Sequence, residues 1–316
     1  TTEIYTLSLH DALPIWPRPL EHRRRSQRRL ITLTKPLPHP APPGQGSEII
    51  MTMPTYFISH GGGPWPWMPE AQTMYAPLRA ALQDIPRQLG RSPKAILMVS
   101  AHWEAQQENL LVAAAPQPSM VYDYYGFPSH TYEIHYPAPG DPALAQQVCN
   151  LLEAAGLPTR LDRERGFDHG AFVPAYIIYP QAKVPMVQLS IHANYDPALH
   201  YAMGEALAAL RDEDVLIIGS GLSYHNLRNM GPGGVEPSAR FDTWLDQSLS
   251  LRDPAARRQA LMDWEQAPAA RIAHPREDHL VPLMVAVGAA QGDAAYRFHH
   301  ETQAFGGLTV SSYRFG

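Results

Sequence analysis

Four short runs of apolar, largely β-branched residues recur between residues 55 and 221, and longer helical stretches separate them. The runs are TYFISH (55–60), KAILMVSAH (94–102), VPMVQLSI (184–191) and DVLIIGSG (214–221). Because nearly every position in them is apolar, we expect these strands to be covered on both faces, at the centre of a sheet. Strands that alternate with helices are typical of α/β proteins. The pattern predicts a single three-layer αβα domain with a central, mostly parallel or mixed sheet.

Three segments between and after these runs have the periodicity of helices. We expect helices over residues 141–156, 196–213 and 278–292. In the first of them, apolar side chains recur on one face and Gly156 provides a stop signal. Residues 53–316 are long enough to bury one large core, so we expect them to form one domain.

The composition excludes several classes of protein. The only cysteine, Cys149, rules out an intramolecular disulfide framework and a cysteine-ligated metal centre, and it predicts a reducing, cytoplasmic location. A net charge of -5 gives no electrostatic reason to bind nucleic acid. No apolar run approaches the ~20 residues of a membrane helix. The 15 histidines stand out, because imidazole is the commonest metal ligand among side chains.

The first 50 residues differ from the remainder in composition. They contain a basic run, HRRRSQRR, followed by a proline-rich stretch without amphipathic periodicity. The opening TTEIYTLSLHDALPI resembles the peptide produced when a sequencing adaptor is translated in frame with a gene. We therefore expect residues 1–50 to be a disordered, non-native leader without function, with the native start at Met51 or Met53.

Histidines follow three of the predicted strands. His60 and His102 end the first two runs, and the fourth run leads through GSGLSY into His225. Ligands of open α/β sheets bind beyond the carboxyl ends of the strands, so these imidazoles can converge there. The three glycines after His60 allow a close approach of the backbone. One such histidine is usually structural, but three together indicate a metal or catalytic centre.

Seven motifs identify a family that the chain resembles. In order they are SHGGGPWPWM, ILMVSAHWE, YYGFPSHTYEIHYPAPGDPALA, GFDHGAF, VPMVQLSI, GSGLSYHNLR and EDHLVPL. Together they resemble the class III extradiol ring-cleavage dioxygenases, and most closely the DOPA extradiol dioxygenase branch. The resemblance covers residues 53–316. It implies a non-haem iron enzyme that opens the ring of a small catechol-type substrate and incorporates both atoms of O2.

The resemblance also implies a set of metal ligands. His60 and His102 match the two strand-end ligands, and His279 in EDHLVPL matches the histidine that is the third ligand in the DOPA branch. His274, Glu277 and Asp278 lie close by in the sequence. Either carboxylate would complete the two-histidine, one-carboxylate site that is common for non-haem iron. The identity of the third ligand therefore stays open at this stage.

Further roles follow from the same resemblance. His225 in YHNL matches an acid/base residue close to the metal, and His169 in FDHG matches a histidine that contacts the substrate oxygens or dioxygen. Trp65 and Trp67 directly follow the His60 turn, so we expect them to line the site of a flat substrate.

The implied cofactor is Fe(II), and Zn(II) can occupy the same site without supporting the redox reaction. The implied partners are a small aromatic diol and O2, without nucleic acid or membrane, and a homo-oligomer is left open. Two alternatives remain: a zinc-dependent hydrolase that uses the three-histidine site, and a catalytically silent binding protein of the same fold. Retention of His60, His102, His225 and His279 together favours an enzyme over a silent protein.

Overall fold

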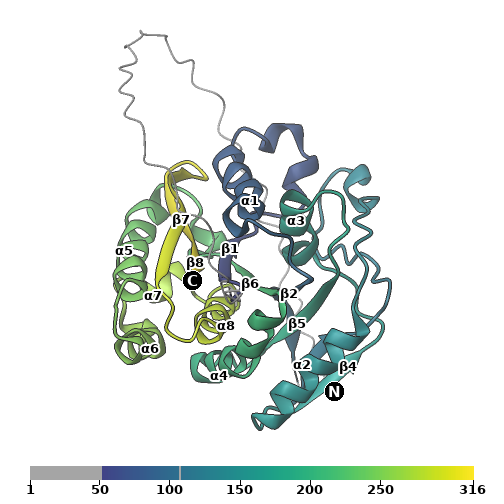
Figure 1. Cartoon of the computed structure of the whole chain (residues 1–316). Coiled ribbons are helices and arrows are strands. Elements are labelled where there is room, and N and C mark those ends of the chain that lie inside the picture. The colour runs from purple at the N-terminus through teal and green to yellow at the C-terminus, as the bar shows by residue number, and fades with distance from the viewer. Residues whose placement is uncertain (1–51, 107) are drawn as a thin grey trace, which may run out of the picture. The chain divides into compact units, whose positions relative to one another are not determined.

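One mixed sheet organises the part of the chain that the structure describes. The structure is a computed structural model and describes residues 52–106 and 108–316; the predicted leader lies outside these ranges. Within them, eight strands lie in the order β4-β3-β5-β2-β6-β1-β8-β7. Figure 1 shows the sheet at the centre of the described residues, with helices around it. The strands are β1 Thr55–Ser59, β2 Ala95–Ala105, β3 Leu110–Ala113, β4 Thr159–Asp162, β5 Met186–His192, β6 Val215–Gly221, β7 Ala295–Ala304 and β8 Leu308–Phe315. The predicted α/β class with a mixed sheet is confirmed.

The four apolar runs of the sequence form the parallel centre of this sheet. Strands β5, β2, β6 and β1 pair in parallel, in that order. The flanking strands run the other way: β3 is antiparallel to β5, and β8 is antiparallel to both β1 and β7. The carboxyl ends of β1, β2 and β6 therefore meet at one edge of the sheet, where the predicted histidines follow them.

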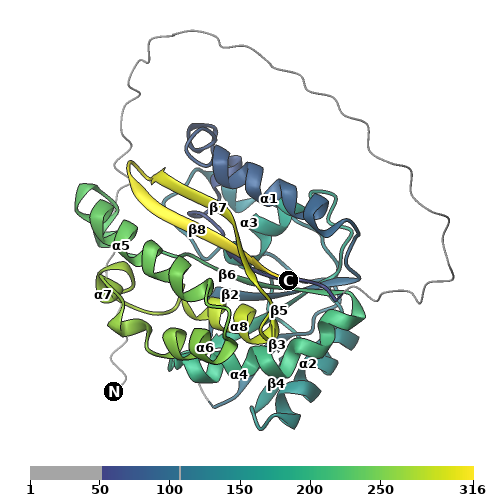
Figure 2. The same ribbon diagram turned by 60° about the vertical axis from the view of Figure 1, so that its left-hand side comes forward.

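Helices cover both faces of the sheet, as Figure 2 shows. Helices α1 (Ala76–Leu89) and α3 (His169–Ile178) lie on one face. The other helices are α2 Pro142–Ala154, α4 Pro197–Leu207, α5 Pro232–Leu249, α6 Pro254–Met262, α7 Ala270–Ala273 and α8 Val281–Ala289. Strand β1 shows the alternation that this arrangement requires: Tyr56 and Ile58 pack in the α1–α3 core, whereas Phe57 packs against α5 and α8.

Two predicted helices differ from the observed ones. The segment 196–213 is divided, because α4 ends at Leu207 and a 3-10 helix follows from Ala208 to Glu213. The segment 278–292 becomes helical only at Val281, after a turn in which the Leu280 amide donates to the Glu277 carbonyl oxygen at 2.7 Å. Pro282 suits the first turn of a helix, because its missing N–H would be unpaired there. His279 consequently lies in the turn and not in the helix.

The C-terminal hairpin of β7 and β8 was not predicted from the sequence. Its first strand, AYRFHHETQA, is largely polar and only partly buried, and it lies at the edge of the sheet. Such a strand lacks the apolar run that revealed the central four. Among the described residues, no helix is long and apolar enough to cross a membrane.

Candidate active site

His60 lies directly after β1, and a hydrogen bond at its Nδ1 fixes the orientation of its ring. Its Nδ1 is 3.1 Å from Oγ of Ser220 in β6. The Ser220 hydroxyl donates its own proton to the Gly170 carbonyl oxygen at 2.5 Å. The serine oxygen must therefore accept from His60, which places the imidazole proton on Nδ1 and leaves a lone pair on Nε2. The ring is buried, with 1% of the residue exposed.

His102 lies within β2 and not at its end, which corrects the predicted boundary. Ser100 pairs with Ser190 and Glu104 pairs with Ile191, so residues 101–103 have no partners in β5. Such a bulge bends a strand and changes the direction of a side chain. Nδ1 of His102 lies 3.1 Å from Oδ2 of Asp123, a carboxylate oxygen that only accepts hydrogen bonds. Its proton is accordingly on Nδ1, and Nε2 again carries a lone pair.

His279 reaches the same place from the turn before α8. The turn lies against the end of β6, where the Leu222 amide donates to the His279 carbonyl oxygen at 3.1 Å. A Cβ atom on Gly221 would lie 2.1 Å from that oxygen, so the close approach requires glycine. Oδ2 of Asp278 lies 3.0 Å from Nδ1 of His279. The carboxylate favours a proton on that nitrogen and leaves Nε2 free.

The Nε2 atoms of these three histidines converge. Nε2 of His102 is 3.2 Å from Nε2 of His60 and 3.2 Å from Nε2 of His279. Two nitrogens that bind one ion at about 2.1 Å and a near right angle are themselves about 3 Å apart. Three lone pairs that face one another repel unless a cation lies between them. The donor set therefore fits a divalent transition metal held by neutral imidazoles.

The other candidates for a third ligand point elsewhere. Glu277 accepts a hydrogen bond from Arg271 at 2.7 Å. His274 is buried, and its Nε2 lies 3.0 Å from the Ser223 carbonyl oxygen. Asp278 directs its carboxylate to the Nδ1 side of His279 and His225. Of the four side chains considered, only His279 places a nitrogen beside His102.

His169 and His225 lie beside different members of this cluster, His169 beside His102 and His225 beside His279. His169 is the first residue of α3, and its ring centroid is 3.9 Å from that of His102. Candidate ligand atoms of His60, His102 and His169 all lie within 4.8 Å of one another, as do those of His225, Asp278 and His279. His225 stacks on His279, and its Nδ1 is 3.7 Å from Oδ1 of Asp278. All five predicted histidines thus gather at one end of the sheet.

Comparison with known proteins identifies the family of the chain that carries this histidine cluster. The family model described as the catalytic LigB subunit of aromatic ring-opening dioxygenase matches residues 54–316. The chain belongs to this family. The predicted superfamily and the predicted class of enzyme, an aromatic ring-opening dioxygenase, are confirmed.

Individual relatives support the extradiol branch of the LigB family. The chain is 38% identical over 266 residues to a 4,5-DOPA dioxygenase extradiol of Beta vulgaris, covering 83% of this chain and 96% of the relative. It is 35% identical over 277 residues to the protein of the same name from Escherichia coli, covering 85% and 98%. A crystal structure of an uncharacterized protein from Escherichia coli K12 superposes with a TM-score of 0.67 at 32% identity, covering 84% of this chain and all of that one.

Burial and neighbouring charges set the protonation of this LigB-family site. Burial lowers the pKa of His60 and of His279 well below the usual range, and neighbouring imidazoles lower it further. Burial is the largest single influence on His102 and acts to lower its pKa, but the hydrogen bond to Asp123 and the negative charges of Asp123, Asp168 and Asp278 together outweigh it, so the net shift is upward. Burial acts to raise the pKa of Asp123 and Asp278, but their histidine partners outweigh it and lower both. Both carboxyl groups are therefore ionised.

The two predicted tryptophans take different positions. Trp65 is buried in the core, where it stacks on Tyr75 at 4.5 Å and donates from Nε1 to the His60 carbonyl oxygen at 2.9 Å. It thereby holds the His60 turn in place, and its expected contact with substrate stays a prediction. Trp67 is partly buried and packs on Tyr176 of α3 at 4.6 Å. Sequence proximity to His60 alone suggested both roles.

An aromatic segment lies beside His169 and the glycines that follow His60. The ring of Tyr124 lies 5.8 Å from the His169 ring and 5.5 Å from the Phe127 ring. Phe127 packs so closely on Gly63 that a Cβ atom there would lie 2.9 Å from it. Gly63 also has a φ of +54°, which favours glycine. The Tyr124 and Phe127 rings are thus further flat side chains close to the histidine cluster.

Sequence reasoning missed three polar residues that hold the histidines. Asp123 bonds both His102 and His169, and Ser220 bonds His60. Asp168 caps α3 through the Ala171 amide and also accepts from Ser100, Arg165 and Gln188, so it fixes the position of His169. The serine of GSG and the aspartate of FDHG lay inside motifs, but Ser220 contacts His60 and Asp168 contacts Ser100 and Gln188, all of them distant in the sequence.

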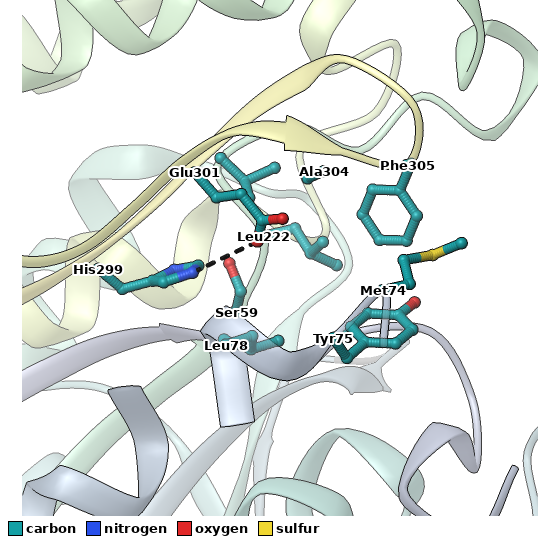
Figure 3. Close-up of a pocket in the computed structure, with 11 residues that line it drawn as sticks. Ser59, Met74, Tyr75, Leu78, Leu222, His299, Glu301, Ala304 and Phe305 are labelled. Atoms are coloured by element: carbon teal, nitrogen blue, oxygen red, sulfur yellow. Dashed lines mark ion pairs between the residues drawn. The ribbon is translucent and has the colours of Figure 1, made fainter. Parts of the chain in front are cut away.

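A small cavity lies on the other side of the His60 turn, between β1, α1 and β7. It is lined by residues that include Ser59, Gly61 and Tyr75 but none of the five histidines of the cluster. Figure 3 shows the His299 imidazole, the Glu301 carboxylate and the Ser59 hydroxyl pointing toward one another there. Nε2 of His299 is 3.7 Å from Oε2 of Glu301. This cavity is separate from the candidate active site.

Proposed function

We propose that the chain uses Fe(II), held by His60, His102 and His279, to open a catechol-type ring beside its two hydroxyl groups with O2. The observation that carries the proposal is the convergence of three Nε2 atoms at 3.2 Å contacts, each on an imidazole whose Nδ1 faces an acceptor. Bound Fe(II) supplies the redox chemistry that O2 requires and the positive charge that acidifies catechol hydroxyls. Zn(II) fits the same donors but has no second oxidation state, so it supports binding without turnover.

His225 is the proposed acid/base residue. Its ring lies against His279, and its Nδ1 faces the ionised Asp278 at 3.7 Å. A carboxylate on that side favours a proton on Nδ1 and leaves Nε2 to take a proton from a substrate hydroxyl. An imidazole suits this task near neutral pH, because it can both accept and return a proton.

His169 is proposed to contact the substrate or O2 beside His102. Its Nδ1 donates to Asp123 at 2.9 Å, so its Nε2 is an acceptor. An acceptor at this position can orient a substrate hydroxyl by taking a hydrogen bond from it. His169 and His225 thus approach the metal cluster from two sides, which suits a substrate with two adjacent hydroxyl groups.

The proposed substrate is a small, flat aromatic diol of the DOPA type. The names of the similar proteins from Beta vulgaris and Escherichia coli support this class, and the Tyr124 and Phe127 rings provide a matching surface. The proposed location remains the cytoplasm, on the evidence of the single cysteine.

The test is reconstitution of the metal-free protein with Fe(II) under anaerobic conditions, followed by a panel of catechols and admission of O2. We expect O2 uptake matched to the appearance of a yellow ring-opened product, with DOPA among the substrates. The Zn(II)-loaded protein and the His60→Ala variant should be inactive. Turnover without O2 in the Zn(II)-loaded protein would instead identify a hydrolase, and iron-loaded protein inactive towards every catechol would contradict the proposal.

A further inference from the structure

Asp123 is an acidic residue between two functional histidines. It lies in the irregular segment between β3 and α2, and its side chain is 19% exposed although the residue as a whole is exposed. Oδ2 lies 3.1 Å from Nδ1 of His102, and Oδ1 accepts from Nδ1 of His169 at 2.9 Å. Oδ1 also accepts from the backbone amide of His169 at 3.0 Å. One carboxylate therefore contacts a proposed metal ligand and a proposed substrate contact.

The contacts determine where both imidazoles carry their protons. An ionised carboxylate accepts hydrogen bonds and donates none, so both Nδ1 atoms must be donors. Oδ1 also accepts from the backbone amide of His169, so it acts as an acceptor toward two donors. A neutral imidazole has a single N–H, so both Nε2 atoms are left as acceptors. The opposite tautomer of either ring would direct an N–H into the site, where it could neither bind a cation nor accept a substrate proton.

We propose that Asp123 is a positioning residue that imposes the same tautomer on His102 and His169 and so prepares one for metal and the other for substrate. The inference rests on the proposed role of His102 as a ligand. Carboxylates that accept from the second nitrogen of a metal-bound imidazole raise its basicity and fix its orientation. Asp123 does this for His102 and extends it to a second imidazole 3.9 Å away.

If Asp123 only held the backbone in place, it would need only the hydrogen bond from the His169 amide and not its contacts with the two imidazoles. The bond from the His169 amide ties the Asp123 segment to the start of α3 and needs only one acceptor oxygen. Asparagine retains that acceptor and the size of the side chain. Its second group, however, is an NH2 donor, which would face the Nδ1 of one imidazole and force a proton onto the Nε2 of that ring. The Asp123→Asn substitution therefore separates the two roles.

Asp278 does not offer the same test. It lies 3.0 Å from Nδ1 of His279, but that nitrogen has no partner at hydrogen-bond angles, and His225 is 3.7 Å away. Asp141 is a better control. Its Oδ1 accepts only from the backbone amides of Ala143 and Leu144 at the start of α2, a role that asparagine also fills at helix N-termini.

The experiment records histidine ¹⁵N spectra of the metal-free full chain, wild type, Asp123→Asn and Asp141→Asn, with assignment by His102→Gln and His169→Gln. Fe(II) and Zn(II) dissociation constants are measured on the same proteins by competition with a chelator. We expect Nδ1–H tautomers for both rings in the wild type. In Asp123→Asn we expect the opposite tautomer in at least one ring and metal dissociation constants raised about 10–100-fold. Asp141→Asn should match the wild type in both measurements.

Two results would overturn the proposal. One is an Nε2–H tautomer at His102 or His169 in the wild type, which needs no variant to fold. The other is a folded Asp123→Asn protein with unchanged tautomers and metal affinity. Neither measurement depends on ring opening, so a failure of the proposed reaction with every catechol would leave this inference standing.

Discussion

His225 and His279 stack with their ring centroids 3.4 Å apart and their planes 22° from parallel. In nearly parallel stacked rings, the lone pairs of the nitrogens lie in two separate, nearly parallel planes. The two rings therefore cannot direct lone pairs at the same metal ion. Nε2 of His279 contacts Nε2 of His102 at 3.2 Å. The stack therefore favours different roles for the two rings, with His279 toward the proposed metal site and His225 beside it.

Replacing His225 by alanine should reduce turnover while the metal stays bound. General acid–base groups typically contribute ~10²–10⁴-fold to a rate, and we expect a loss in that range. Iron content after gel filtration and kcat on a responsive catechol are the measurements. His60→Ala is the comparison, because it should lose metal and activity together. Equal metal loss in the two variants would make His225 a ligand.

Replacing His279 by alanine should abolish retention of iron, whereas Glu277→Gln should leave it intact. His279 supplies one of the three converging nitrogens, and the Glu277 carboxylate is engaged by Arg271. Both residues lie in the same turn, so the pair is a matched comparison of position. Iron retained by His279→Ala but lost from Glu277→Gln would show that the carboxylate is the ligand.

Gly221→Ala should destabilise the protein and weaken metal binding. The new Cβ atom would lie 2.1 Å from the His279 carbonyl oxygen, so the turn that carries His279 must move. Overpacking of this kind typically costs about 1–3 kcal/mol of the free energy of unfolding. Gly231→Ala is the control, because nothing lies within 4 Å of a Cβ atom there. Denaturant unfolding and metal titration of both variants are the measurements, and equal behaviour would contradict the close approach.

Acidification should destabilise the fold through His200. This buried residue accepts from the His192 amide at Nε2 and contacts the Asp196 carbonyl oxygen at Nδ1. Burial lowers its pKa from 6.5 to about 4. Between pH 6.5 and pH 4, His200 is protonated in the unfolded chain but neutral in the folded protein. The free energy of unfolding should thus fall as the pH drops from 6.5 to 4, by about 3 kcal/mol at about 1.4 kcal/mol per pH unit.

The measurement for His200 is denaturant unfolding at a series of pH values, with His200→Gln as the comparison. Glutamine can both donate and accept but does not titrate. The variant should therefore lose less stability than the wild type over this range. The same slope in both proteins would place the effect elsewhere.

The parts of the site that follow the apolar runs could be predicted from the sequence. His60 directly follows a central strand, and the positions of His102 and His225 at the carboxyl ends of other apolar runs predicted that they would meet it, as the parallel pairing of β1, β6 and β2 allows. Asp123 could not be found in this way, because it lies in an irregular segment with no periodicity and its partners are 21 and 46 residues away in the chain. Adjacency to His60 does not show which way a side chain turns: Trp65 packs on Tyr75 in the core, and its predicted role in lining the substrate site stays a prediction.

The three unpaired residues in β2 have a consequence for how this enzyme tolerates changes in chain length. Beyond these three residues, Glu104 and Ala105 resume pairing with Ile191 and His192. The direction of the His102 side chain is therefore not fixed by the regular alternation of side chains along the strand. A single-residue deletion between Ser100 and Glu104 would leave the strand pairing on either side intact. It would, however, shorten the unpaired segment that sets the direction of the His102 imidazole. Insertions and deletions in this short interval should therefore be far more damaging to catalysis than to folding, which is the reverse of what is usual for a central strand.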